Sequence, residues 1–363
     1  MTADTVGGVW TYSLDLAKAL GAEGVKVTCV ASGGRPSPAQ EAAAAAIPNL
    51  TLVGLDGRLE WQRDCEDDLA ALDSLLLGIE EDERPDVVHV NGFAQAAAGF
   101  SAPVVLVAHS CVGTWWRACH GGPAPAEWNR YRGRIAAGLA AADAVVTPSA
   151  AFLATFCAEH GRPARARAIH NGRDGSLFCP RRKKPFALAA GRLWDEAKNT
   201  SVLAEVARRV DHPILVAGEG APIADALNFV SLGPLEPGAL ARRMGEAAVF
   251  VAPARYEPFG LAVLEAALSG AALVLSDIAT FRELWDGAAE FVDPQDAGAI
   301  AAAVDRLLAD GAAASAAGAA ARRRARRYGL EPMGRAYLDL YGGLVAERRG
   351  RWPAHALPME AMR

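Results

Sequence analysis

Short apolar runs alternate along the chain with longer runs in which apolar residues recur at helical spacing. Buried parallel strands appear as continuous β-branched segments, and the crossover helices between them show the longer period. One series of candidate strands fills the first half, and a second series begins after residue 185. We therefore predict an α/β fold with two doubly wound, Rossmann-like domains that face a cleft. The predicted strands are Val25–Val30, Leu50–Val53, Val87–Val90, Val104–Ala108, Ala144–Thr147, Phe186–Ala190, Ile214–Ala217, Phe229–Leu232, Val249–Ala252, Ala272–Leu275 and Glu290–Val292.

A polar segment flanked by prolines, residues 179–185, lies between the two series of strands. Segments of this composition are typical of domain boundaries. We therefore predict a first domain over residues 1–178, a hinge over 179–185 and a second domain over 186–331. The last predicted unit is residues 332–363.

The start of the chain is unusual for this fold. Asp4–Gly8 has the composition of a loop that follows a first strand, and Val9–Leu20 that of the next helix, yet only Met1–Ala3 precede them. A buried strand normally has about five residues. Two interpretations stay open: a very short first strand, or a start that lacks part of it. Under the second, native residues added upstream should stabilise the protein.

Composition narrows the class of protein. The chain has 37 Lys and Arg against 42 Asp and Glu, a net charge of −5, whereas a general nucleic-acid binder carries a positive excess. No apolar run reaches the roughly 18–20 residues of a spanning helix, and the amino terminus lacks the basic and apolar regions of a signal peptide. The sequence therefore indicates a folded cytoplasmic protein without stable membrane insertion; its oligomeric state is not predicted.

Cysteine and histidine spacing gives no sign of a metal site. The six cysteines form no Cys-x-x-Cys pair, and the seven histidines form no His-Glu-x-x-His motif. The chain also has no Asp-x-Asp triplet of the kind that holds Mg²⁺ beside a diphosphate. We predict reduced cysteines and no bound metal or other resident cofactor.

The most informative motif is Arg255–Glu265, which follows the predicted strand Val249–Ala252 and opens a helix. Open α/β sheets bind ligands at this carboxyl edge. Gly260 permits a close backbone approach, and the free N–H groups near Phe259 and Leu261 form an anion site. The motif therefore predicts a phosphate-binding helix start.

Charged side chains flank this helix start. Glu257 stands just before the helix, and Glu265 lies inside it, where a carboxylate can bond the vicinal hydroxyls of a ribose. Arg192 follows the strand Phe186–Ala190 at the same sheet edge, with Lys198 close behind. Arginine offers a fork for phosphate oxygens and lysine a compact charge, so together they predict a diphosphate clamp.

Candidate residues in the first domain are fewer. Gly7 and Gly8 open a helix and can approach a phosphate or sugar across the cleft. His109 ends the strand Val104–Ala108, where its side chain is expected to face the cleft. A hydrogen-bonded structural histidine is the competing interpretation.

An acceptor site is predicted nearby. Asn91 ends a strand, and the segment after His109 is rich in aromatic residues, among them Trp115 and Trp116. Amphipathic aromatic side chains suit a sugar or another polyol, although they suit a loop packed onto the domain almost as well, and Asn91 is as readily a packing residue as an acceptor-binding one.

These residues together give the chain a resemblance to the retaining glycosyltransferases of family GT4, which have the GT-B fold. The resemblance rests on the glycine pair, His109, Asn171-Gly172, Arg192 with Lys198, and the Glu-x7-Glu motif of Glu257 and Glu265. The stretch after Pro332 resembles the terminal helix that crosses back to the first domain. His170 departs from the pattern, because a proline is usual before Asn-Gly, and so does the short first strand.

The resemblance implies transfer of a hexose-type sugar from a nucleoside-diphosphate sugar, most commonly a UDP-sugar, to a hydroxyl of a small polar or glycan acceptor. Arg192 and Lys198 would neutralise the diphosphate, with help from the Gly260 and Leu261 amides. Glu265 would bond the ribose, Glu257 the hydroxyls of the transferred sugar, and His109 that sugar from the first domain. No enzyme nucleophile would be needed.

Two other functions stay open at this point. A non-hydrolysing nucleotide-sugar epimerase shares the two-domain architecture and would turn over donor without an acceptor. A non-catalytic protein that binds nucleotide sugars or glycans would bind without turnover. The retained set of charged residues argues against a decayed site.

Overall fold

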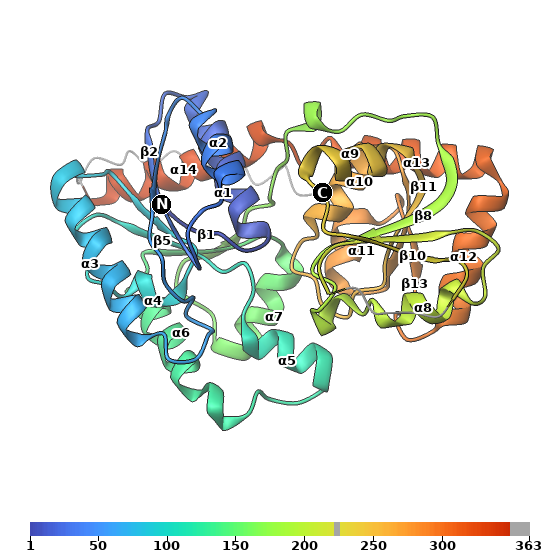
Figure 1. Cartoon of the computed structure of the whole chain (residues 1–363). Helices are drawn as coiled ribbons and strands as arrows, with labels where there is room; N and C mark the ends of the chain where they lie inside the picture. Colours follow the sequence, from blue (N-terminus) through green and yellow to red (C-terminus); the bar gives the residue numbers. More distant parts are fainter. Residues whose placement is uncertain (221–225, 349–363) are drawn as a thin grey trace.

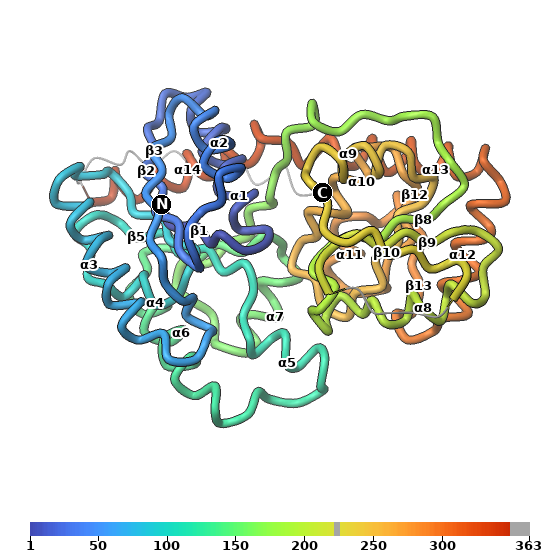
Figure 2. Tube along the Cα trace, in the orientation of Figure 1, coloured from blue at the N-terminus to red at the C-terminus, as the bar shows by residue number. Residues whose placement is uncertain are grey.

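The computed structural model describes residues 1–220 and 226–348, which form two lobes side by side (Figure 1). Parallel strands lie at the centre of each lobe and helices cover them. Figure 2 follows the connection between the last strand of the first lobe and the first strand of the second, which passes from one lobe to the other. The strands of the first lobe are β1 (Thr2–Asp4), β2 (Val27–Ser32), β3 (Leu50–Gly54), β4 (Val88–Val90), β5 (Val104–Val107), β6 (Ala144–Thr147) and β7 (Ala166–Ala168). Those of the second are β8 (Lys184–Ala190), β9 (Ile214–Ala217), β10 (Phe229–Gly233), β11 (Ala247–Ala252), β12 (Ala272–Ser276) and β13 (Glu290–Val292).

The sheet of the first lobe consists of two parts. Strands β1, β2 and β3 pair in one part, and β4 to β7 pair in chain order in the other. Asn91 joins the parts, because its backbone N–H donates to Thr2 Oγ1 at 2.8 Å and its side chain donates to the Thr2 carbonyl at 2.6 Å. This bridge places the residues that follow β1 and β4 beside one another.

The second lobe has a six-stranded parallel sheet in the order β10-β9-β8-β11-β12-β13. Its central strands are buried on both faces, since successive side chains of a strand point to opposite sides. In β11, Phe250 packs in one apolar cluster with Leu264, whereas Val249 packs in the other with Val304. The strand order reverses between β8 and β11, and such reversals are where open α/β sheets bind ligands.

Helices form where apolar residues recur at helical spacing and polar residues cap the first turn. Asp310, for example, accepts the Ala312 and Ala313 N–H groups at 3.0 Å and begins the alanine-rich α13. The α-helices are α1 (Gly8–Gly21), α2 (Pro38–Ala45), α3 (Glu66–Glu83), α4 (Phe93–Ala96), α5 (Val112–His120), α6 (Asn129–Ala141), α7 (Ala150–His160), α8 (Ser201–Ala207), α9 (Pro237–Glu246), α10 (Leu261–Leu268), α11 (Ala279–Trp285), α12 (Ala297–Ala309), α13 (Gly311–Ala325) and α14 (Leu330–Arg348). Short 3₁₀ helices are η1 (Ala126–Trp128), η2 (Gly175–Leu177) and η3 (Glu196–Lys198).

Helix α14, the last helix in the described part of the chain, returns to the first lobe and lies along α1 (Figure 1). Its buried residues Tyr337 and Leu340 pack in one cluster with Tyr12 and Leu16 of α1 and with Val105 of β5. Residues at opposite ends of the chain therefore share one core.

The predicted α/β architecture with parallel sheets is confirmed, and the elements differ from the prediction in detail. Strand β7 was not predicted. The last residues of the predicted hinge 179–185 belong to β8, because Lys184 pairs with Ala247 of β11. Of the predicted unit 332–363, the described part lies in α14, and residues 349–363 lie outside the described residues.

Candidate active site

A cavity of about 450 Å³ lies at the carboxyl edge of the second sheet and is closed on its other side by the first lobe. It brings together most of the predicted site residues from segments far apart in the sequence. Asn91 and Trp116 do not line it. The predicted residues that line it are Gly7, Gly8, His109, Trp115, Arg192, Lys198, Glu257, Phe259, Gly260, Leu261 and Glu265.

Arg192 lies in this cavity against the backbone of Gly7. A Cβ atom at Gly7 would be 3.0 Å from Arg192 Nη1, at the flexible end of that side chain, and the φ of Gly7 is +81°, so the backbone conformation favours glycine. Arg192 Nη2 also donates to Asp195 Oδ2 at 3.1 Å. The Arg192 side chain is 45% exposed, so Asp195 orients its guanidinium but leaves the group open to the cavity.

Lys198 and Glu257 form an ion pair in the cavity, with 2.5 Å between Nζ and Oε2. Both side chains are mostly buried. Beside them, Gly260 begins α10 with a φ of +92°, and a Cβ there would lie 3.2 Å from a ring atom of Phe281. The first-turn N–H groups of α10 point into the same space, where an anion can accept them.

Glu265 is held by an ion pair that sequence analysis did not predict. Arg173, which follows β7, places its Nε 2.8 Å from Glu265 Oε1 and also pairs with Asp15 of α1. Burial raises the pKa of Glu265, and the positive charge of Arg173 opposes that rise. The buried trio links the first helix of one lobe to α10 of the other.

His109 is neutral and has a defined tautomer. Burial lowers its pKa to about 3. Its Nε2 lies 2.8 Å from Asn91 Oδ1, while the amide nitrogen of Asn91 donates to Thr2, so His109 Nε2 is the donor. Nδ1 of His109 is thereby left as a hydrogen-bond acceptor.

Two further cavity residues were not predicted as site residues. Asn171 is 5% exposed, lines the cavity, and has no hydrogen-bond partner for Oδ1 within the described chain. Its signal in the sequence is the Asn-Gly pair after β7. Tyr256 also lines the cavity, and its hydroxyl lies 3.0 Å from Ser110 Oγ and 2.9 Å from Thr114 Oγ1. Tyr256 thus joins the lobes at the mouth of the site.

The aromatic segment makes contacts other than those expected of an acceptor platform. Trp115 Nε1 donates to Asp195 Oδ1 at 2.9 Å, so α5 contacts the residue that orients Arg192. Trp116 packs against His120, with 4.4 Å between ring centroids. Asn91 is bonded at both ends of its amide. The structure therefore does not bring Asn91, Trp115 and Trp116 together around one space.

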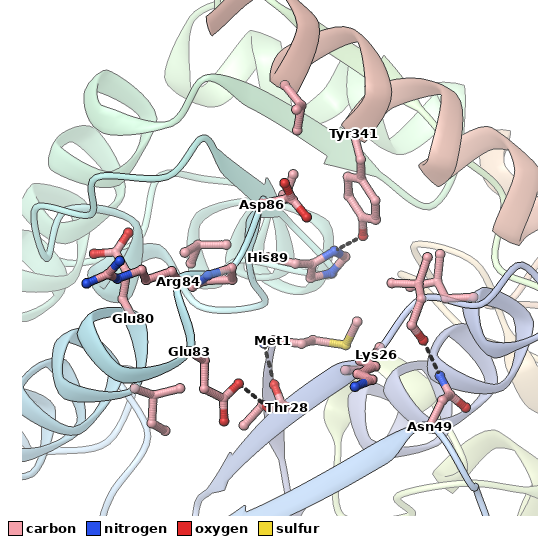
Figure 3. A pocket seen from close by; sticks show the side chains of 18 of the residues that line it. Met1, Lys26, Thr28, Asn49, Glu80, Glu83, Arg84, Asp86, His89 and Tyr341 are labelled. Atoms are coloured by element: carbon pink, nitrogen blue, oxygen red, sulfur yellow. Dashed lines mark hydrogen bonds between the residues drawn. The ribbon is translucent and has the colours of Figure 1, made fainter. Parts of the chain in front are cut away.

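A larger cavity, about 1350 Å³, lies at the amino-terminal ends of β2 and β4 (Figure 3). The Met1 amino group reaches into it and donates to the Thr28 carbonyl at 2.7 Å. His89 Nδ1 lies 2.6 Å from the Tyr341 hydroxyl across its floor. None of the predicted site residues lines this cavity, and it lies at the wrong end of the strands for an α/β active site.

Two family models match consecutive parts of the chain. Glycosyltransferase Family 4 matches residues 6–176, and Glycosyl transferases group 1 matches residues 165–310. Between them they include each of the cavity residues described above. The chain belongs to glycosyltransferase family 4. The predicted family and enzyme class of this glycosyltransferase are confirmed.

Named relatives agree with this assignment. Glycogen synthase of Mycobacterium tuberculosis is 28% identical over 315 residues, which cover 78% of this chain and 74% of that one. Sucrose-phosphate synthase from Thermosynechococcus elongatus has a similar structure, with a TM-score of 0.77, 22% identity and coverage of 94% of each chain. Anabaena Alr3699/HepE in complex with UDP-glucose aligns with a TM-score of 0.74 at 15% identity, over 93% and 96% of the two chains. These structures confirm the GT-B fold of the glycosyltransferase.

The described residues contain neither a candidate membrane span nor a candidate metal-binding cluster. No helix within residues 1–220 and 226–348 of the glycosyltransferase has the length and apolar character to cross a bilayer. The same ranges contain no group of three or more His, Cys, Asp or Glu side chains placed to hold a metal ion.

Proposed function

We propose that the glycosyltransferase moves a hexose-type sugar from a UDP-sugar to a hydroxyl of a small polar or glycan acceptor, with retention of configuration. The observation that carries the proposal is the meeting of Arg192, Lys198 and the start of α10 in one cavity. Two cations and a helix N-terminus suit a diphosphate. UDP-glucose bound to the similar Alr3699/HepE structure supports the choice of donor.

Each of these residues would contact a different part of the donor. Arg192 and Lys198 contact the diphosphate with the first-turn amides of α10. Glu257, released from Lys198 by the phosphate, contacts hydroxyls of the sugar. Glu265, held by Arg173, accepts the ribose hydroxyls. His109, which belongs to the first lobe, accepts a hydrogen bond at Nδ1 from a hydroxyl of the sugar.

The chemical step depends on charge. As the glycosidic bond loosens, negative charge grows on the leaving phosphate, and preorganised cations and N–H groups stabilise it in a site that excludes water. In a front-face reaction the bond between the sugar carbon and the leaving phosphate oxygen breaks, and the acceptor oxygen bonds to that carbon on the same face. The leaving phosphate oxygen takes the proton of the acceptor hydroxyl. No side chain of the enzyme then has to act as the nucleophile, and none in the cavity is required to change its protonation state.

A melting experiment tests the donor clamp. The wild type, Arg192→Ala and the control Arg209→Ala, an exposed arginine of the same lobe, would be melted with UDP, GDP, ADP and TDP. A nucleotide at 100 times its dissociation constant adds about 2.7 kcal/mol of stability. We expect UDP to shift the wild type and the control by several degrees and Arg192→Ala by much less. A cooperative transition that no nucleotide shifts would contradict the proposal.

Turnover gives the second test. Loss of one preorganised donor costs about 10²–10³ in rate in comparable sites. We expect Arg192→Ala and Lys198→Ala to lower kcat at least about tenfold without loss of the folded state by circular dichroism, and Arg209→Ala to leave it unchanged. Near-normal kcat in both cavity variants would refute the clamp. NMR of donor alone separates an epimerase, which would convert it, from a transferase.

A further inference from the structure

A separate small pocket of about 40 Å³ lies in the first lobe at the seam between β1 and β4. It contains two polar groups that lack partners within the described chain. Gln95 is 4% exposed, and its Nε2 makes no hydrogen bond. The Asp4 carboxylate at the end of β1 also has no hydrogen bond or ion pair among the described residues. An unpaired buried polar group costs roughly 1–3 kcal/mol, more when charged, unless a ligand or water satisfies it.

The charged residues of the pocket other than Asp4 already have partners. Glu60 accepts the Phe93 and Ala94 N–H groups at 3.0 and 2.7 Å, and Arg58 donates to Asp68 at 2.7 Å. Among the charged and amide groups that line the pocket, this leaves the Asp4 carboxylate and Gln95 Nε2 without a partner in the described chain.

The pocket adjoins the donor cavity. Asn91 lines the pocket and accepts the hydrogen bond of His109, which lines the donor cavity. Burial raises the pKa of Asp4 to about 7, Glu60 adds to that rise, and the charge of Arg192 opposes it. Asp4 is therefore within electrostatic reach of the predicted diphosphate clamp.

The open groups define the chemistry of a ligand. A carboxylate accepts hydrogen bonds and an amide nitrogen donates them, and a hydroxyl group satisfies both at once. A phosphate or carboxylate of a ligand would add a further negative charge beside the two acidic groups Asp4 and Glu60, and Arg58 is already paired with Asp68. The pocket measures about 40 Å³ against about 450 Å³ for the donor cavity, so it suits a hydroxyl or hydroxymethyl group rather than a sugar ring.

We propose that this pocket binds a hydroxyl group of a neutral, polyol-type acceptor, and that Asp4 and Gln95 select it. The proposal rests on the proposed function for the adjoining donor site. The remainder of the acceptor lies outside the pocket, toward His109, where the reacting hydroxyl can meet the donor. The enzyme therefore discriminates against acceptors with a phosphate at this end.

Ligand-observed saturation-transfer NMR tests the pocket directly. The probes are D-glucose, glycerol and D-glucose 6-phosphate, each measured with saturating UDP. The proteins are the wild type, Asp4→Ala, Gln95→Ala and the control Asp56→Asn, whose carboxylate in the same lobe is 69% exposed. We expect the wild type and the control to give saturation-transfer signals with D-glucose and glycerol. In both pocket variants these signals should be at least about fivefold weaker. D-glucose 6-phosphate should bind to the wild type more weakly than D-glucose does.

Three results would overturn the proposal: unchanged signals in Asp4→Ala and Gln95→Ala, preferential binding of the 6-phosphate, or no signal from either neutral probe in the wild type. UDP-induced melting shifts on the same samples show that each variant is folded and binds nucleotide. If UDP shifts no sample, the proposed donor fails, while loss of the neutral probes in the pocket variants still supports the pocket. A UDP shift without any effect of the variants on the probes refutes the pocket alone.

Discussion

At the scale of single residues, Asp4 illustrates how a binding group can oppose folding. Its carboxylate ends a strand, lies among buried side chains and is close to the carboxylate of Glu60. The folded protein therefore holds the proton of Asp4 more tightly than the unfolded chain does. A residue that weakens the fold in this way is retained most readily where it contacts a ligand.

The raised pKa of Asp4 predicts how the stability of the folded protein depends on pH. The pKa of Asp4 is about 7 in the folded state and close to 3.8 when the chain is unfolded. Its contribution to stability is thus greatest when it is protonated, and is lost as pH rises from about 4 to 7. We expect Asp4→Asn to melt several degrees above the wild type at pH 8, with a difference that shrinks toward pH 5, by calorimetry. A difference that does not vary with pH, or that matches the exposed control Asp56→Asn, would contradict this account.

At the scale of secondary structure, helix α5 connects the first lobe to the cation of the donor site. Trp115 donates to Asp195, Asp195 accepts from Arg192, and Thr114 lies against Tyr256 of the second lobe. Burial raises the pKa of Asp195, but the Trp115 hydrogen bond and the charge of Arg192 outweigh it, so the net pKa is lowered and the carboxylate stays ionised. The helix therefore helps to orient Arg192 when the lobes are together.

Replacing Trp115 by Phe keeps the ring and removes its Nε1 donor. We expect Trp115→Phe to lower kcat about three- to tenfold, which corresponds to about 0.6–1.4 kcal/mol and to the net contribution of one typical hydrogen bond, and to change the donor KM less. The neighbouring Trp116→Phe is the matched control, because Trp116 packs on His120 of its own helix. Equal kcat values in the two variants would show that α5 does not orient the clamp.

Much of each element was predictable from the sequence, and the failures have physical reasons. Continuous β-branched runs such as Val104–Val107 identify a buried strand by themselves. Strand β7 has the sequence Ala-Arg-Ala and no β-branched residue, so only its pairing with β6 defines it. Sheet-edge reasoning was enough to predict that Arg192 and Glu257 share a cavity.

Contacts between lobes could not be predicted in this way. Whether Trp115 meets an acceptor or Asp195 depends on how two separately folded sheets pack, and no local period contains that information. The same holds for Arg173, whose partners Asp15 and Glu265 come from different lobes. Gln95 carries no motif, and its open amide is apparent only with Glu60 and Asp4 beside it.

At the scale of the whole molecule, α14 makes the first lobe depend on the end of the chain. Leu340 is 6% exposed and packs in one cluster with residues of α1 and β5. Large-to-small changes at such positions cost about 2–5 kcal/mol. The contact is thus a sizeable fraction of the stability of an ordinary domain.

We expect Leu340→Ala to lower the free energy of unfolding by that amount in urea titrations, and the exposed control Glu331→Ala, whose side chain is 77% exposed, to change it by less than about 0.5 kcal/mol. Fluorescence and circular dichroism should both report the change, because the first lobe loses part of its core. Equal midpoints for the two variants would show that α14 contributes little to the fold.

The return of α14 also sets an order of events during synthesis. The ribosome releases the chain from its amino end, so the second lobe can fold while the apolar side of α1, with Tyr12 and Leu16, still lacks its cover. The lobe made first is then the last to be completed. Nascent chains stopped before residue 330 should accordingly present that apolar side to chaperones until α14 has left the ribosome and covers it.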